Sequence, residues 1–206
     1  MQHKFRPEDS ESLDFYADID HELGRLLELG AIVGATADHG MNAKQTPTGE
    51  PKVIYLESLL RQELGDGVKV ILPITDPYVL HHGALGSLAC VHLPDSANAG
   101  AVISRLLELD GVTEAYERQV AAQKLELPAD RIGDIVVLSG RDVVLGRTPE
   151  DHDLEAVKDG LRSHGGRYEE MVPFFLSEKI SGEYSCRTGD LRNFDIFEFT
   201  SNGSQA

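Results

Sequence analysis

Apolar residues recur at helical spacing along residues 10–29, and the pattern ends at Gly30. Residues three or four places apart lie on one face of an α-helix, so this segment is predicted to be an amphipathic helix. The run Ala31-Ile-Val-Gly-Ala-Thr36 follows and predicts a buried strand. A helix, a glycine and a run that is apolar on both faces are typical of an α/β unit whose strand lies parallel to its neighbours.

The middle of the chain alternates between predicted strands and helices. Residues 46–49 are expected to form a loop, and 54–64 a helix that ends at Gly65. Further strands are predicted at 68–72, 85–93 and 112–116, further helices at 97–109 and 118–125, and a hairpin about Gly140 from 134–139 and 143–145. The pattern favours an inserted α+β cap subdomain at 51–149, although a continuation of the main sheet is the alternative.

Composition and charge restrict the class of protein. The 206 residues carry a formal net charge of −16, which disfavours nucleic acid and acidic membrane surfaces as partners. No apolar run approaches the roughly 18 residues that a membrane span needs, and the polar N-terminus does not resemble a signal peptide. We therefore expect a cytoplasmic protein. The two cysteines, Cys90 and Cys186, lack metal-binding spacing and are expected to behave as small apolar residues.

The first candidate for chemistry is the pair Asp38 and His39, which directly follows the predicted strand. Ligands of α/β sheets gather at the carboxyl ends of strands. A carboxylate and an imidazole there can share a divalent cation, and Gly40 lets the backbone turn beside them. A hydrogen-bonded surface pair is the alternative interpretation of Asp38 and His39.

A longer set of motifs resembles the phosphonoacetate hydrolases of the alkaline phosphatase superfamily. The set begins with Thr36-Ala-Asp-His-Gly-Met-Asn-Ala-Lys44 and includes Leu161-Arg-Ser-His-Gly-Gly166. Other matching segments, in the expected order, lie at 74–86, 127–134, 145–149, 151–154 and 191–197. The resemblance implies an α/β fold with a partial alkaline-phosphatase-like core at 1–50 and 150–206, a predominantly parallel sheet, and the cap between them.

The resemblance also implies a site with two zinc ions. In this family, the first ion is held by the Asp and His of the DHG motif, by an aspartate near the start of the protein and by a threonine nucleophile. The second ion is held by an Asp-x-x-x-His pair and by a histidine near the end. Asp38 and His39 therefore match the first ion, while His3 and His164 match the second. Ligand type alone does not separate zinc from manganese or iron.

The family motif around His3 places the partner aspartate four residues earlier, which is two residues before Met1. We therefore expect this chain to correspond to the C-terminal half of the family, without the threonine nucleophile and inactive alone. A missing N-terminal half or a homodimer partner is expected. A non-catalytic metal-binding remnant is one alternative, and another phosphodiesterase or phosphomutase chemistry of the superfamily is a second.

The reaction implied for the complete relatives, in the breakdown of phosphonates, is hydrolysis of phosphonoacetate to acetate and phosphate. Breaking a carbon–phosphorus bond leaves negative charge on carbon, which the adjacent carboxylate accommodates as an enolate. His81 and His82 precede Gly83 in the predicted cap, and one of them is a candidate contact for the substrate carboxylate. A structural hydrogen-bonding role is the alternative for both histidines.

Several other polar residues have a simpler structural interpretation. Asp151, His152 and Asp153 are predicted to start a helix, and Asp18 with His21 to lie on a solvated helix face. Asn42 and Lys44 follow the DHG motif closely enough to support metal ligands indirectly, with an exposed loop as the default alternative. The arginines that flank His164, Arg162 and Arg167, could contact an anionic substrate or backbone carbonyls.

Overall fold

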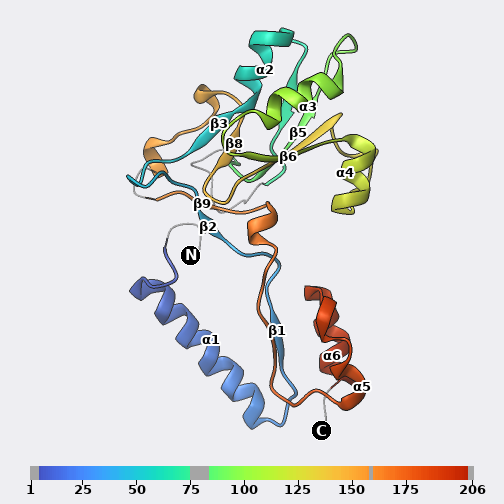
Figure 1. The fold of residues 1–206 in the computed structure, drawn as a ribbon. Coiled ribbons are helices and arrows are strands. Elements are labelled where there is room, and N and C mark those ends of the chain that lie inside the picture. The colour runs from blue at the N-terminus through green and yellow to red at the C-terminus, as the bar shows by residue number, and fades with distance from the viewer. Residues whose placement is uncertain (1–4, 75–83, 158–159, 204–206) are drawn as a thin grey trace. The chain divides into compact units, whose positions relative to one another are not determined.

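The computed structural model describes residues 5–74, 84–157 and 160–203 (Figure 1). By its internal contacts the chain divides into two compact units. The first consists of Met1–Gly40 with Met171–Ala206, and the second of Met41–Glu170. The segment 51–149, predicted as a cap, lies within the second unit, which begins before it and ends after it.

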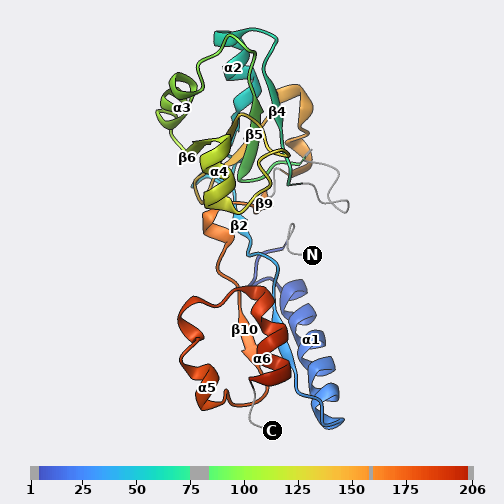
Figure 2. The same cartoon turned by 90° about the vertical axis from the view of Figure 1, so that its right-hand side faces the viewer.

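The first unit is built on a two-stranded ribbon. Strand β1 (Gly34–Thr36) pairs antiparallel with β10 (Phe174–Leu176), and Ala35 lies opposite Phe175. Helices α1 (Ser10–Glu28) and α6 (Ile196–Asn202) lie on opposite sides of this ribbon (Figures 1 and 2). The remaining elements are α5 (Gly182–Ser185) and the 3₁₀ turns η4 (Thr188–Asp190) and η5 (Asn193–Asp195).

Helix α6 is packed tightly against one face of the ribbon. Phe199 is fully buried, and its ring meets Phe174 edge-on at 5.5 Å between centroids. A Cβ atom at Gly34 would collide with Thr200 and crowd Ile196, so the close approach of α6 requires a glycine there. This contact fixes the strand that leads into the DHG motif.

The second unit contains an antiparallel sheet in the order β4-β5-β7-β6. Its strands are β4 (Lys69–Ile71), β5 (Leu88–His92), β6 (Val112–Glu117) and β7 (Ile135–Ser139). Residues of α2 (Leu56–Leu64) and α3 (Ala99–Leu107) pack on the face that carries Val91 and Val137. Residues of α4 (Arg118–Leu125) pack on the face that carries Cys90 and Val136. Because side chains alternate along a strand, a strand covered on both faces is buried along its whole length, as β7 is.

Two shorter strand pairs complete the second unit. Strand β2 (Asn42–Ala43) pairs antiparallel with β9 (Arg162–Ser163), and β3 (Val53–Tyr55) pairs parallel with β8 (Val144–Gly146). The 3₁₀ turns are η1 (Pro149–Asp151), η2 (Glu155–Val157) and η3 (Arg167–Glu169). The pair β2–β9 links the segment after the DHG motif to the segment that carries His164.

The α/β class with a parallel strand pair is confirmed, and the helices at 10–29, 54–64, 97–109 and 118–125 form within a few residues of the prediction. The prediction of a hairpin about Gly140 is wrong. Both edges of β7 are occupied by β5 and β6, so the chain leaves this sheet after Gly140 and β8 pairs with β3 instead. The partner of β1 also differs from the prediction, because β10 runs antiparallel to it.

In the part of the chain that the structure describes, no helix is both long and apolar enough to cross a membrane. The cytoplasmic location stays a prediction of the sequence. Cys90 is buried in the core, as expected of a small apolar residue, whereas Cys186 is exposed on the first unit.

Candidate functional site

Asp38 and His39 lie side by side just beyond the end of β1. Nε2 of His39 is 3.7 Å from Oδ2 of Asp38, and the other carboxylate oxygen accepts the backbone amide of His39 at 3.0 Å. Nδ1 of His39 lies 2.9 Å from the carbonyl oxygen of Gly40. Since a carbonyl oxygen only accepts hydrogen bonds, Nδ1 carries the ring proton and Nε2 is the basic nitrogen of the neutral ring.

The backbone beneath this pair is held by Asn193 of η5. Its side-chain amide donates to the carbonyl oxygens of Ala37 at 3.2 Å and of Asp38 at 3.4 Å. Asn193 belongs to the segment 191–197, whose sequence resembles the family but predicts no role for this residue. Its contacts show that this segment anchors the turn that presents Asp38 and His39.

The separation of the two donor atoms is compatible with a shared zinc ion. Zinc bonds to imidazole nitrogen and carboxylate oxygen are about 2.0–2.2 Å long, so two of them span at most about 4.4 Å. The observed 3.7 Å lies within that limit. The described residues contain no group of three or more His, Cys, Asp or Glu side chains that could hold a metal ion. The pair therefore fits as half of a zinc site.

His164 lies in the second unit, on the turn that follows β9. The backbone amide of Ser87 donates to the carbonyl oxygen of His164 at 2.8 Å. Gly165 has φ +100°, a left-handed conformation that favours glycine, and a Cβ atom there would lie 2.6 Å from the side chain of Ile74. The turn that presents His164 is thus fixed by hydrogen bonding and by close packing.

A fully buried lysine lies beneath this turn. Nζ of Lys44 donates to Oε1 of Glu169 at 2.9 Å, to Oγ of Ser87 at 2.7 Å and to the carbonyl oxygen of Arg141 at 2.8 Å. Three hydrogen bonds use all the donors of an ammonium group. The exposed loop that was the default expectation for Lys44 is therefore wrong, because its side chain is 0% exposed.

Glu169 connects this lysine to the turn that carries His164. Its Oε1 also accepts from Nδ2 of Asn42 at 2.6 Å, and its Oε2 accepts the backbone amide of Gly166 at 3.0 Å. The segment after the DHG motif and the segment after β9 are therefore joined through one buried carboxylate. The sequence around Glu169 does not indicate its burial, because a single acidic residue carries no local signal of being buried.

Burial lowers the pKa of the Lys44 ammonium below its ordinary value of 10.5, and the hydrogen bond and charge of Glu169 offset part of this shift. Between the folded-state pKa and 10.5 the unfolded chain binds more protons, so the free energy of unfolding rises with pH across that window. Below the folded-state pKa both states are protonated and the contribution is constant.

We expect this rise with pH in the wild type but not in the double variant Lys44→Met/Glu169→Gln. Urea unfolding of both proteins at several pH values up to 10.5 measures the difference. Parallel pH profiles for the two proteins would show that Lys44 does not titrate with folding.

The other candidates have structural contacts. His152 is buried, and its Nε2 accepts the backbone amide of Arg147 at 3.0 Å. Arg162 donates to the carbonyl oxygen of Met41 at 3.4 Å. Arg167 pairs with Glu114 at 3.2 Å and with Glu170 at 2.6 Å. The contact of Arg162 with a backbone carbonyl matches its simpler interpretation, whereas Arg167 pairs with carboxylates. The helix start predicted at Asp151, His152 and Asp153 is wrong, because the 3₁₀ turn η1 ends at Asp151 and the backbone of His152 is extended.

The predicted site residues belong to different parts of the chain. Asp38 and His39 are neighbours in the first unit, and His164 belongs to the second. His3, His81 and His82 lie outside the described residues. The convergence of Asp38, His39, His3 and His164 on a pair of cations stays a prediction.

Known proteins resemble this chain in sequence and fold. Phosphonoacetate hydrolase from Sinorhizobium meliloti 1021, solved in complex with phosphonoacetate and with phosphonoformate, is 44% identical to it with a TM-score of 0.87. The match covers 99% of this chain and 49% of that enzyme, so this chain spans about half the length of that relative.

Murine ectonucleotide pyrophosphatase / phosphodiesterase 5 has the same fold at 16% identity, with a TM-score of 0.55 over 86% of this chain and 44% of its own. Residues 1–167 match the family of type I phosphodiesterases and nucleotide pyrophosphatases. The chain therefore belongs to the type I phosphodiesterase / nucleotide pyrophosphatase family, within the alkaline phosphatase superfamily.

Proposed function

We propose that this chain supplies part of the zinc-dependent site of a phosphonoacetate hydrolase, which cleaves phosphonoacetate to acetate and phosphate. The observation that carries this proposal is the similarity of nearly the whole chain, at 44% identity, to an enzyme whose structure holds phosphonoacetate. The fold shared with the ectonucleotide pyrophosphatase extends over 86% of the chain at only 16% identity, and therefore indicates no substrate.

In this proposal, Asp38 and His39 hold one zinc ion, and His3 and His164 contribute to the second. The hydrogen bond from Nδ1 of His39 to Gly40 orients the ring so that Nε2 and Oδ2 of Asp38 act together. Asn193 keeps the backbone of this turn in place. When bound, zinc would withdraw charge from the phosphoryl oxygens of the substrate.

The 206 residues are proposed to be inactive by themselves. Catalytic zinc usually has three protein ligands, whereas the DHG turn offers two. The resemblance implies an attacking threonine and further metal ligands. These would come from a segment equivalent to the half of the Sinorhizobium meliloti enzyme that this chain does not match. Without a nucleophile, metal binding alone would not split the carbon–phosphorus bond.

A fused protein tests this function directly. The unmatched half of the Sinorhizobium meliloti enzyme would be joined before Met1, so that completion of the site does not depend on the affinity between the halves. The fusion with zinc should release phosphate from phosphonoacetate, and the 206-residue chain alone should not. If the fusion hydrolysed bis(p-nitrophenyl) phosphate but not phosphonoacetate, a phosphodiesterase would be favoured instead. Turnover of phosphonoacetate by the 206-residue chain alone would contradict its proposed inactivity.

Replacing the DHG donors should weaken zinc binding by the 206-residue chain. The double variant Asp38→Asn/His39→Gln is expected to lower the affinity of the tightest zinc site at least about tenfold, because direct ligands matter more than the residues that support them. Isothermal titration with zinc measures the change.

The matched control is Asp18→Asn/His21→Gln, which removes the same two side-chain types from the exposed face of α1. Equal zinc affinity in both double variants would show that Asp38 and His39 do not hold the ion.

A further inference from the structure

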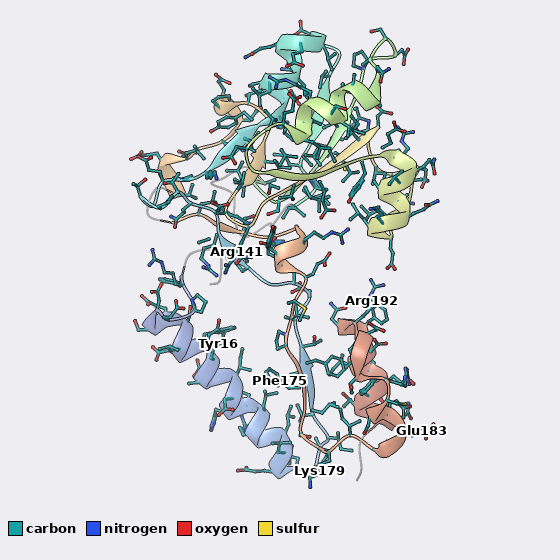
Figure 3. All side chains as sticks on the ribbon, in the orientation of Figure 1. Tyr16, Arg141, Phe175, Lys179, Glu183 and Arg192 are labelled. Atoms are coloured by element: carbon teal, nitrogen blue, oxygen red, sulfur yellow. The ribbon has the colours of Figure 1, made fainter. Side chains whose placement is uncertain are left out.

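An apolar groove runs between α1 and the β1–β10 ribbon of the first unit. It has a volume of about 470 Å³. Tyr16 on α1 and Phe175 on β10 line it from opposite sides (Figure 3). Protein interiors are close-packed and hold few voids larger than a water molecule, so an opening of this size is not ordinary core packing.

The groove lies between the apolar face of α1 and one face of the β1–β10 ribbon, and surfaces of this kind are normally buried in a core. Its α1 residues recur at helical spacing and form one stripe, namely Tyr16, Ile19, Asp20, Leu23, Gly24 and Leu27. Opposite this stripe, Val33 and Ala35 line the groove, whereas Gly34 between them faces α6. The ribbon is thus covered by α6 on one face, and its other face opens into the groove.

Large apolar side chains remain exposed here. Tyr16 is 40% exposed, Ile19 42%, Leu27 46% and Phe175 65%. Exposed apolar patches of this kind mark interaction surfaces. Among the described strands, β1 pairs only with β10, which leaves the ribbon two strands wide. A two-stranded ribbon is marginally stable in water, and a free strand edge can accept another strand.

The length of the relatives indicates what covers this surface, because the matched region is 49% of the Sinorhizobium meliloti enzyme. We propose that the groove receives an apolar, extended segment of a polypeptide equivalent to the unmatched half of that enzyme. The segment adds as a strand along the ribbon and packs beneath α1. This inference rests on the proposed completion of the site by that half, but not on the identity of the substrate.

Two adjacent leucines of α1 provide a matched test. Leu27 lines the groove and is 46% exposed, whereas Leu26 does not line it and is 45% exposed. The full chain would be co-expressed with the unmatched half of the Sinorhizobium meliloti enzyme, and the complex measured by sedimentation velocity and by hydrogen exchange of β1. We expect a one-to-one complex with slowed exchange in β1. Leu27→Asp should weaken it at least about tenfold, and Leu26→Asp less than about twofold.

The possible outcomes separate this inference from the proposed function. Absence of a complex, or equal weakening by both leucine variants, would overturn the groove as the docking surface. A dimer of the chain alone that Leu27→Asp dissociates would assign the groove to a second copy instead. A Leu27-dependent complex together with an inactive fusion would support the groove and reject phosphonoacetate hydrolysis. Circular dichroism of both variants checks that α1 still folds.

Discussion

Replacing Glu169 by leucine is expected to lower the free energy of unfolding of the second unit by about 3–5 kcal/mol, the range measured when one partner of a buried ion pair is removed. The loss follows because the ammonium of Lys44 stays fully buried without its carboxylate. The side chain of Asn42 and the amide of Gly166 also lose their acceptor. Hydrogen exchange of amides in β5 and β7 measures the change in this unit alone.

Two further variants make this result specific. Lys44→Met/Glu169→Leu should recover much of the lost stability, because it removes both charges and leaves apolar side chains of similar size. Glu170→Leu is the neighbouring control: it breaks an exposed pair with Arg167 and should cost less than about 1 kcal/mol. If Glu169→Leu were no less stable than Glu170→Leu, the buried pair would not hold this turn together.

Replacing Gly165 by valine is expected to destabilise the same unit by about 2–4 kcal/mol, from backbone strain together with overpacking. The residue has φ +100°, and its Cβ would lie 2.6 Å from the side chain of Ile74. Because Gly165 follows His164 directly, the strain should also displace that histidine. In the fused protein, phosphate release from phosphonoacetate should therefore fall together with stability. Urea unfolding and the phosphate assay measure the two effects.

A variant at Gly49 separates the backbone strain from the overpacking. It lies in the same unit with φ +92°, and a Cβ atom there would meet nothing within 4 Å. Gly49→Val should therefore show only the backbone strain. Adding Ile74→Ala to Gly165→Val should recover the packing part of the loss, since the smaller side chain makes room for the new one. Equal losses in Gly165→Val and Gly49→Val would show that contact with Ile74 does not matter.

The correct predictions from sequence concern features that neighbouring residues determine. Helical spacing of apolar residues identified α1 and α2, since one apolar stripe is enough to predict an amphipathic helix. The DHG turn could also be found locally, because its two donors are adjacent and Gly40 supplies the carbonyl that orients His39. The wrong hairpin has the opposite cause: the partner of a strand depends on which sheet edges other segments have already occupied.

The sequence by itself determined the class of fold, the main helices and the pair Asp38 and His39, because these depend on contacts within a few residues of the chain. Only the tertiary structure decided that Lys44 is buried and donates a hydrogen bond to Glu169, which lies 125 residues away. It also decided that one face of the β1–β10 ribbon is covered by α6 while the other opens into an apolar groove. Burial and strand pairing arise between distant segments, and no local pattern of residues encodes which segments meet.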